Sequence, residues 1–404
     1  MADSWSVPVA ERALDASVVV PGSKSATARA LVLSALADGP GTIDGGLVAR
    51  DTDLMIAALR ALGAGIDTTD AVSPPAATFS PSAVTLSTPA AAPDHNPAAA
   101  NSGLSPDTPS VRDFDRPATG SPISPQGWRI QPIADPVGGQ SIDCGLAGTV
   151  LRFVPPLAAL ATRPTRFYGD VAAAERPIAP LLDGLVQLGA TVTGDRLPFT
   201  VTGPLTGRTA TIDASGSSQF VSGLLLAAAR FPDGLELHHA GPPIPSWPHI
   251  EMTLQALADR GVATGVTTDD DPANPSTATT AASWRIAPDP IQARNETIEP
   301  DLTTAAVFLA AALVAGGSVT VPGWPRHTSQ PGAQTPAILT AFGGHFELTE
   351  AGLTVTGDGQ LHGLEVDLRA TSELTPVVAA LAVLADSPTT IRGVAHIRGH
   401  ETNR

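Results

Sequence analysis

The stretch VVVPGSKSATARALVLSALADGPGTIDG, residues 18–45, decides the fold that we expect for this chain. It reads as a short apolar strand, a turn of small polar residues, an apolar helix that stops at Asp38 and Gly39, and a second strand. Residues 51–66 follow as a more amphipathic helix and a further strand. Strands that alternate with helices are typical of α/β units. The first helix is apolar almost all round, so we expect it to be buried and the second helix to lie outside.

The same unit recurs along the chain, and we count five copies. Each copy has a strand, a turn rich in small polar residues, a buried helix, another strand, an outer helix and a strand pair. The first strands are expected at residues 18–20, 141–143, 211–213, 297–299 and 365–367. The fold class that we predict is therefore α/β, built from repeated βαβαββ units.

Two segments interrupt the repeat. Residues 67–126 and 265–282 are dominated by Pro, Ala, Ser and Thr and have no apolar period. Such segments cannot offset their ordering entropy by burying apolar surface, so we expect disordered surface insertions. A partner-binding segment is the alternative interpretation.

Bulk properties exclude several classes of protein. A net charge of −16 argues against nucleic acid or an anionic membrane as the general partner. Cys144 is the one cysteine, so no intrachain disulfide can form, which fits a reducing compartment. The N-terminal residues do not resemble a signal peptide, and the apolar runs are too short to span a bilayer. We expect a cytoplasmic monomer.

The turns before the buried helices are the candidate binding site. A helix N-terminus presents free backbone N–H groups and the positive end of the helix dipole, so it attracts anions. Five such turns can converge on one cluster of anionic groups. Ser, Thr and Asp at these places are also ordinary helix caps. Cations beside the turns favour the anion site, because a cap needs none; they are Lys24, Arg152, Arg176 and Arg404.

These turns carry motifs that resemble the enolpyruvyl transferases, specifically the actinobacterial type of the shikimate-pathway branch. The likeness runs from about residue 18 to residue 404 outside the two insertions. The motifs are, in chain order, PGSKS at 21–25 followed by Arg29, LAGTVLR at 146–152, RPI at 176–178, SSQF at 217–220 and HETNR at 400–404.

The resemblance implies a two-domain enolpyruvyl transferase fold with buried parallel helices and ligands in the cleft between the domains. Residues 21–295 are expected to form a central domain, and residues 1–20 with 296–404 a second one. The family has six units, three in each domain. We therefore expect the sixth unit and half of the fifth, which carry further phosphoenolpyruvate-binding cations in the family, to be absent from these 404 residues.

The resemblance also implies a reaction. The enolpyruvyl group of phosphoenolpyruvate passes to the 5-hydroxyl of shikimate 3-phosphate, phosphate leaves, and a tetrahedral intermediate lies between the two steps. This chemistry needs cations for two phosphates and two carboxylates, a base for the hydroxyl, and an acid near C3 of phosphoenolpyruvate. No metal or cofactor is expected. Glyphosate is expected to bind at the phosphoenolpyruvate site.

The motifs assign a phosphoenolpyruvate site residue by residue. Lys24 is expected at the phosphate and in proton transfer. Gly148 and Thr149 form a turn where a larger side chain would block the phosphate. Arg176 precedes a proline suited to the first position of a helix. The expected set is Lys24, Gly148, Thr149, Arg176, Gln219 and Arg404.

The shikimate 3-phosphate site is assigned in the same way. Ser25 and Arg29 share one face of a helical turn and are expected to hold the carboxylate. The serine-rich turn should bind the 3-phosphate and a ring hydroxyl, with Ser246 nearby. The expected set is Lys24, Ser25, Arg29, Ser217, Ser218, Gln219, Ser246, Glu373 and His400.

Two carboxylates are expected to transfer protons. Glu373, where many relatives have Asp, is expected to be the base for the 5-hydroxyl, and Glu401 the acid and base at C3. His249 stands where many relatives have an aromatic hydroxyl, so its role is open. Asp301 is predicted to be a helix cap. Arg152 either pairs with a phosphate or covers its helix.

Three alternatives remain beside this interpretation. The branch that acts on UDP-N-acetylglucosamine has Lys–Asn in the first turn and a nucleophilic cysteine, whereas this chain has Lys24–Ser25 and no cysteine near Arg176. A cyclase acting on RNA 3′-phosphates shares the unit architecture, but the acidic charge disfavours it. An inactive fragment of the shikimate-pathway enzyme is the third.

Overall fold

The computed structural model describes residue 10 and residues 12–70, 126–268 and 281–399. Its strands are β1 (Leu14–Ser17), β2 (Gly41–Asp44), β3 (Gly65–Asp70), β4 (Gln126–Gln131), β5 (Ser141–Asp143), β6 (Thr165–Tyr168), β7 (Thr191–Thr193), β8 (Phe199–Thr202), β9 (Thr209–Ile212), β10 (Leu235–Ala240), β11 (Thr264–Thr268), β12 (Ala281–Ile286), β13 (Glu296–Thr297), β14 (Gly317–Val321), β15 (His345–Thr349), β16 (Gly352–Gly357), β17 (Glu365–Asp367) and β18 (Thr390–Arg392).

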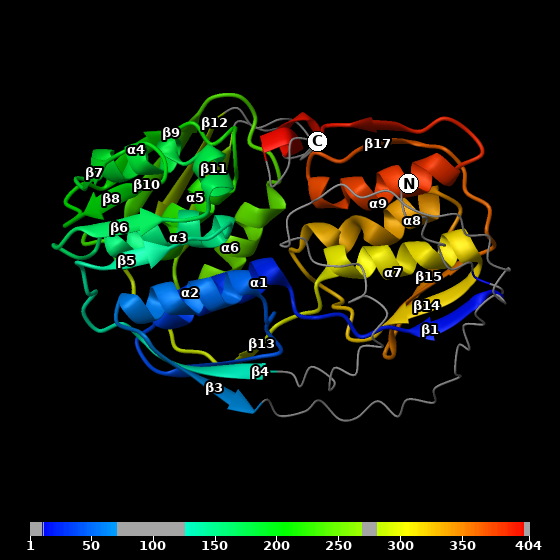
Figure 1. Ribbon diagram of the computed structural model, residues 1–404, viewed down its shortest axis with the longest axis horizontal. Coiled ribbons are helices and arrows are strands. Elements are labelled where there is room, and N and C mark those ends of the chain that lie inside the picture. Colours follow the sequence, from blue (N-terminus) through cyan, green and yellow to red (C-terminus); the bar gives the residue numbers. More distant parts are fainter. Residues whose placement is uncertain (1–9, 11, 71–125, 269–280, 400–404) are drawn as a thin grey trace, which may run out of the picture.

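The helices lie between these strands (Figure 1). The α-helices are α1 (Lys24–Ala35), α2 (Arg50–Ala61), α3 (Gly148–Ala158), α4 (Ala179–Gln187), α5 (Gln219–Ala228), α6 (Pro248–Ala258), α7 (Leu302–Ala315), α8 (Thr335–Ala341) and α9 (Thr375–Leu384). Short 3-10 helices are η2 (Val171–Glu175), η3 (Pro331–Gln334), η4 (Ser372–Leu374) and η5 (Ala395–Gly399).

One sheet topology is used four times, which confirms the α/β repeat predicted from the sequence. In each sheet a first strand runs parallel to a second, and two more strands follow antiparallel. The strand orders are β13-β2-β4-β3, β5-β6-β8-β7, β9-β10-β12-β11 and β1-β14-β16-β15. Strands β17 and β18 form a parallel pair of their own within the described ranges.

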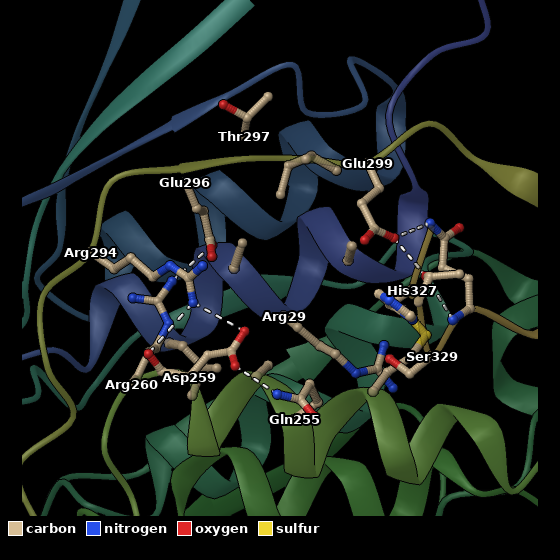
Figure 2. A pocket seen from close by; sticks show the side chains of 18 residues that line it. Arg29, Gln255, Asp259, Arg260, Arg294, Glu296, Thr297, Glu299, His327 and Ser329 are labelled. Atoms are coloured by element: carbon tan, nitrogen blue, oxygen red, sulfur yellow. Dashed lines mark hydrogen bonds and ion pairs between the residues drawn. The ribbon is translucent and has the colours of Figure 1, made fainter. Parts of the chain in front are cut away.

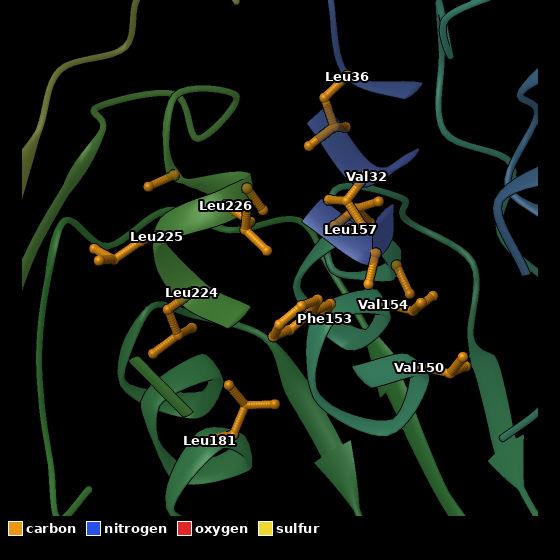
Figure 3. Packing of buried hydrophobic residues seen from close by; sticks show 14 of the residues in the cluster. Val32, Leu36, Val150, Phe153, Val154, Leu157, Leu181, Leu224, Leu225 and Leu226 are labelled. Atoms are coloured by element: carbon orange, nitrogen blue, oxygen red, sulfur yellow. The ribbon is translucent and has the colours of Figure 1, made fainter. Parts of the chain in front are cut away.

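The buried helices make two separate hydrophobic clusters. The first gathers side chains from α1 to α6, with Phe153 and Leu157 of α3 packed near Val32 of α1 and Leu226 of α5 (Figure 3). The second gathers side chains from α7, α8 and α9. The prediction that every first helix is buried is wrong for α9, where only Val378 and Leu381 are buried and Val383 is 84% exposed, because an apolar sequence reports what a helix can bury but not whether a neighbour covers it. Figure 1 shows these two sets of helices in the two halves of the molecule. The exact domain boundary, at residue 295, remains a prediction.

The chain exchanges a strand between the two halves. β1 pairs with β14 in the half that holds α7, whereas β13 pairs with β2 in the half that holds α1. Glu296 and Thr297, which the predicted boundary gives to the second domain, therefore hydrogen-bond to a strand of the first unit. The chain crosses between the halves just after each of these strands.

The two crossings pair with each other. Residues 21–24 and 299–301, which we call the crossover ribbon, lie antiparallel: Ser23 N donates to Glu299 O at 2.8 Å, and Asp301 N donates to Pro21 O at 2.8 Å. Gly22 bridges Pro300 between these two bonds. A Cβ on Gly22 would lie 2.1 Å from a backbone oxygen, so the ribbon needs glycine there.

Asp301 joins the first turns of two buried helices. Its Oδ1 accepts from Thr304 N at 2.8 Å, which is the N-cap of α7 that the sequence predicted. Its Oδ2 accepts from Lys24 N at 3.1 Å, at the start of α1. One carboxylate therefore satisfies a free N–H group at each of two helix starts.

Several boundaries predicted from the sequence are wrong. The first strand lies at β1 rather than at residues 18–20; Val19 is 66% exposed, and pairing with β14 decides which residues form the strand. The first predicted insertion begins too early, because residues 67–70 belong to β3. The second begins too early and ends too late, because residues 265–268 belong to β11 and residues 281–282 to β12. Main-chain pairing holds these residues in strands although they have no apolar period. The remainder of each insertion lies outside the described residues.

Where the chain is described, no helix combines the length and the apolar character that crossing a bilayer requires.

Replacing Asp301 with Ala removes both of its acceptor roles, and we expect a loss of about 1–2 kcal/mol in the free energy of unfolding. Chemical denaturation followed by circular dichroism measures it. Asp301→Asn keeps a capping oxygen and should lose less. Asp195→Ala is the control, because that side chain is exposed and pairs only with exposed Arg196. An Asp301→Ala midpoint equal to that of the control contradicts this role.

Candidate active site

The N-termini of the five apolar helices α1, α3, α5, α7 and α9 meet at one cavity of about 410 Å³, which we call the central cavity. The sequence had singled out these five turns, and each contributes to the wall. The lining residues from them are Gly22 to Ser25, Gly148 and Thr149, Gly216, Ser217 and Gln219, Asp301, Thr303 and Thr304, and Ser372, Glu373 and Pro376. The positive ends of several helices therefore surround one space, with Asp301 accepting from one N–H group at each of the starts of α1 and α7.

Lys24 enters the central cavity from the start of α1. Its Nζ lies 2.5 Å from Asp51 Oδ2, in the first turn of α2, and its side chain is 49% exposed. An ion pair at that exposure contributes little net stability, because water and salt screen it. The ammonium is thus held near the helix start by a contact that an anionic ligand can replace.

Two arginines converge above the start of α3. Arg176 Nη1 donates to Leu146 O at 2.8 Å, and Arg152 Nη2 donates to Pro177 O at 3.0 Å. A Cβ built on Gly148 would lie 2.8 Å from Arg176 Nη2 and 2.9 Å from Arg152 Nη1. Glycine therefore lets both guanidinium groups approach the N-terminus of α3, which concentrates positive charge at one point.

Gln219 connects this positive region to the serine-rich turn. Arg152 Nη1 donates to Gln219 Oε1 at 2.9 Å, and Gln219 N donates to Ser217 Oγ at 3.3 Å. Arg152 is almost fully buried and lies over the Phe220 ring. It therefore covers its helix and also lines the cavity, and its pairing with a phosphate stays a prediction. Ser218, at the N-cap position of α5, is buried and lies outside the cavity lining.

Arg29 lies behind the cavity rather than in its wall. Its Nε donates to Thr253 Oγ1 at 2.8 Å, its Nη1 to Ser25 O at 2.9 Å, and its Nη2 to His249 O at 2.7 Å. Burial lowers the pKa of Arg29 to about 9, so the guanidinium still carries its charge at neutral pH. Ser25 lines the cavity, while Arg29 ties α1 to α6.

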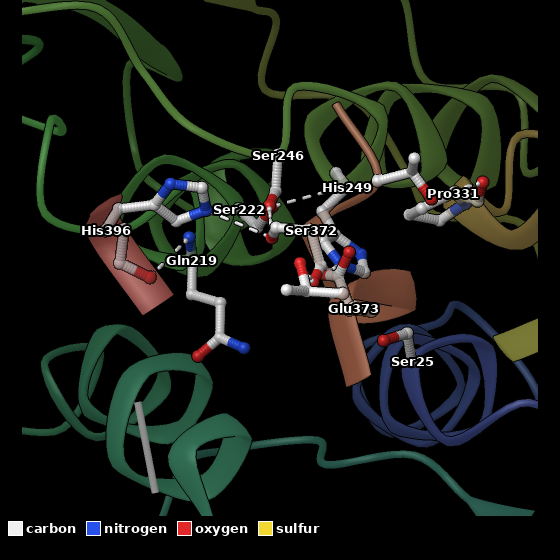
Figure 4. A network of polar contacts seen from close by, with 12 residues as sticks. Ser25, Gln219, Ser222, Ser246, His249, Pro331, Ser372, Glu373 and His396 are labelled. Carbon is white, nitrogen blue, oxygen red and sulfur yellow. Dashed lines mark hydrogen bonds and ion pairs between the residues drawn. The ribbon is translucent and has the colours of Figure 1, made fainter. Parts of the chain in front are cut away.

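Glu373 faces the cavity from the opposite side, in η4 (Figure 4). Its Oε1 lies 2.8 Å from His249 Nε2. Beside this pair, Ser246 Oγ and Ser372 Oγ are 3.2 Å apart, and His396 Nε2 lies 3.0 Å from Ser372 Oγ. Ser246 is buried in this network and is not among the residues that line the cavity, and its role at the 3-phosphate stays a prediction.

A second cavity, of about 620 Å³, lies along α1 and α6 beside the crossover ribbon (Figure 2). Of the arginines that line it, Arg260 pairs with Glu296 at 2.8 Å and Arg294 with Asp259 at 3.0 Å, while Arg29 donates to hydroxyl and carbonyl oxygens. Glu299 also lines this cavity, so its carboxylates balance its arginines. The central cavity is lined by Asp301 and Glu373 as well as by Lys24, Arg152 and Arg176, but it also has the N-termini of several helices around it, so it is the better site for anions, although it is smaller.

Over the described ranges, no three His, Cys, Asp or Glu side chains are grouped closely enough to hold a metal ion.

The structure adds residues that the sequence did not assign to the site. Asp51, Gln330 and Ser372 contact or line the central cavity or its lysine. Ser372 directly precedes Glu373, so the turn motif already pointed to it, whereas Asp51 and Gln330 had no signal of their own. Three assigned residues, His400, Glu401 and Arg404, lie outside the described residues.

Comparisons with known proteins agree in one family. The family model described as EPSP synthase (3-phosphoshikimate 1-carboxyvinyltransferase) matches residues 9–94 and 129–404. A 3-phosphoshikimate 1-carboxyvinyltransferase from Kocuria rhizophila is 45% identical over 100% of this chain and 79% of its own length.

Solved structures share the fold. The EPSP synthase of Acinetobacter baumannii superposes with a TM-score of 0.67 at 17% identity, over 98% of this chain and 77% of that one. The enolpyruvyl transferase NikO of Streptomyces tendae gives a TM-score of 0.59 at 15% identity, over 95% and 76%.

Cys144, buried beside the turn of α3, should be chemically inert. Burial, with a smaller contribution from the Asp143 carboxylate, raises the pKa of the thiol to about 12. At pH 8 the thiolate fraction is then about 10⁻⁴, so iodoacetamide should label the native protein about a thousandfold more slowly than an exposed thiol. Mass spectrometry follows the labelling, with the guanidinium-unfolded protein as control. Equal rates in the two states would contradict this burial.

Proposed function

The chain belongs to the EPSP synthase (3-phosphoshikimate 1-carboxyvinyltransferase) family, and we propose that the central cavity is where it performs the family's reaction. The enzyme transfers the enolpyruvyl group of phosphoenolpyruvate to the 5-hydroxyl of shikimate 3-phosphate and releases phosphate. We place the reaction there because of one observation: five helix starts and the side chains of Lys24, Arg152 and Arg176 converge on one space. Both substrates are multiply charged anions, and the whole chain is strongly acidic, so only such a local concentration of positive groups attracts them.

Phosphoenolpyruvate is proposed to lie at the starts of α1 and α3. The Lys24 ammonium leaves the Asp51 carboxylate and binds the phosphate instead. The Arg176 guanidinium, which lies beside Gly148, approaches the same phosphate. The N–H groups of Gly148 and Thr149 supply donors at the helix start. Gln219, already bonded to Arg152, lies at the border with the second substrate. Arg404 belongs to this proposed set by its motif.

Shikimate 3-phosphate is proposed to lie between the starts of α5 and α1. Ser217 and Gln219 line the wall and offer donors to the 3-phosphate, and Ser218 contributes through its position in the same turn. Ser25 faces the cavity for the carboxylate, with Arg29 behind it adding positive charge. Ser246 and His400 belong to the set by their motifs.

Glu373 is proposed to accept the proton of the 5-hydroxyl as its oxygen attacks C2 of phosphoenolpyruvate. C3 of the enolpyruvyl group gains a proton in the same addition. In the elimination that follows, phosphate leaves C2, C3 gives up a proton, and the double bond reforms. Lys24 and Glu401 are the proposed groups for proton transfer at C3. The cations stabilise the negative charge on the departing phosphate.

We further propose that the enzyme works as a cytoplasmic monomer and that glyphosate inhibits it at the phosphoenolpyruvate site. The concentration of cations around Gly148 supports that site, because glyphosate, like phosphoenolpyruvate, is a small phosphorus oxyanion with a carboxylate.

Phosphate release that requires both substrates tests the assignment. Lys24→Ala and Glu373→Gln should each lower kcat/KM by about a hundredfold or more, because each removes a group that acts on developing charge or on a proton. Arg196→Ala, at an exposed side chain, is the control and should leave the rate unchanged. Wild-type turnover by Lys24→Ala or Glu373→Gln would remove that residue from the mechanism.

Gly148→Ala places a methyl group against the Arg176 and Arg152 guanidinium groups, so they must shift. We expect a higher KM for phosphoenolpyruvate and weaker glyphosate inhibition. Gly216→Ala is the matched control: it lines the same cavity, and its nearest atom would be Phe220 Cε2 at 3.6 Å, which is ordinary contact. Unchanged glyphosate inhibition in Gly148→Ala would contradict the placement of phosphoenolpyruvate at this turn.

A further inference from the structure

The pair His249–Glu373 joins the two halves of the molecule across the central cavity. His249 lies in the first turn of α6, and Glu373 lies in η4, 124 residues further along the chain. The atoms His249 Nε2 and Glu373 Oε1 are 2.8 Å apart, and the side chains are 14% and 27% exposed. An ionised carboxylate only accepts hydrogen bonds, so Nε2 carries the proton and donates it. Partial shielding from water strengthens such a bond.

The backbone of His249 is fixed from behind. Its carbonyl oxygen accepts from Arg29 Nη2 at 2.7 Å, from Thr253 Oγ1 at 3.0 Å and from Ser222 Oγ at 3.3 Å. These donors come from α1, α6 and α5, and all three side chains are buried. The imidazole therefore extends toward Glu373 from a rigid base.

A parallel set of contacts holds the turn that carries Glu373. Ser246 N donates to Arg369 O at 3.2 Å, and its Oγ lies 3.2 Å from Ser372 Oγ. Ser246 has φ of +51°, a left-handed conformation that a non-glycine residue rarely adopts and that the surrounding contacts enforce. Residues 246–249 thus bind residues 369–373 at several points.

We propose that His249 is a positioning residue that holds the Glu373 carboxylate, from the opposite side of the cavity, in the orientation needed to accept the 5-hydroxyl proton. This inference rests on the proposed role of Glu373 as the base. A glutamate has three rotatable side-chain bonds, and η4 is a short 3-10 helix, so a fixed donor removes freedom that would otherwise weaken proton transfer. Since His249 and Glu373 come from different halves, the base is oriented only where the halves meet.

Steady-state kinetics against pH test the proposal with His249→Met and His249→Gln. Met has no donor, and we expect kcat to fall about tenfold while KM for shikimate 3-phosphate changes less than about twofold. The acidic limb of the kcat profile should move to higher pH, because losing a donor disfavours the ionised carboxylate. Gln keeps an N–H donor and should restore most of kcat, which a purely structural role would not predict.

The other charged groups around the cavity are unchanged in these variants, so the differences report on His249. Among the described residues they include Lys24 from α1, Arg152 from α3, Arg176 at the end of η2, Asp301 before α7, and His396 of η5, which contacts Ser372. His362→Met is the matched control: His362 pairs with Asp386 at 2.8 Å on the exposed surface, and its loss should leave the kinetics unchanged. Binding of shikimate 3-phosphate, measured by titration calorimetry, verifies that each variant is folded.

A double variant separates this proposal from the one it rests on. In a Glu373→Gln background, His249→Met should cause no further loss, because His249 acts through the carboxylate. Wild-type turnover by Glu373→Gln alone would overturn the proposed base and the positioning role with it. A severe loss in Glu373→Gln with an unaffected His249→Met would overturn the positioning role alone. A raised KM for shikimate 3-phosphate with an unchanged kcat in His249→Met would also overturn the positioning role, because it indicates that His249 contacts the substrate directly.

Discussion

The antiparallel crossover ribbon, residues 21–24 against 299–301, is the constraint on which the rest of the structure depends. Two backbone hydrogen bonds and the Asp301 carboxylate bring the start of α1 next to the start of α7. Because α1 belongs to one hydrophobic cluster and α7 to the other, this contact aligns the helix starts of both halves around one space. Gly22 is needed there because any side chain would strike backbone.

The charge of the site follows from this alignment. A chain with a net charge of −16 repels anions at long range, so recognition depends on short-range groups. Helix starts provide N–H donors that are fixed before a ligand arrives, and Lys24, Arg152 and Arg176 add full charges beside them. Protein contacts hold each of these cations in place before binding. Preorganisation of this kind is what stabilises charge as it develops in a reaction.

Local patterns in the sequence predicted what depends on neighbours in the chain. The repeat, the α/β class, the buried helices of the first three units, the Asp301 cap and the turns that line the cavity all follow from short motifs and apolar periodicity. Contacts between distant segments could not be derived in this way. The pairing of β13 with β2, the Lys24–Asp51 pair and the His249–Glu373 pair each depend on tertiary packing. Arg29 shows the same limit, since its motif carries no sign of the hydrogen bonds that it makes to Thr253 and His249 in α6.

The insertion boundaries show a related limit, because composition reports the cost of ordering a segment but not the hydrogen bonds that a neighbouring strand offers. Residues 67–70 are polar, yet they pair with β4.

A crystal structure of the protein with shikimate 3-phosphate bound tests the account most directly. The account predicts the phosphate at the serine-rich start of α5, on Ser217 and Gln219, and the 5-hydroxyl within hydrogen-bonding distance of Glu373. A ligand in the second cavity along α1 and α6, or a 5-hydroxyl directed away from Glu373, would contradict it.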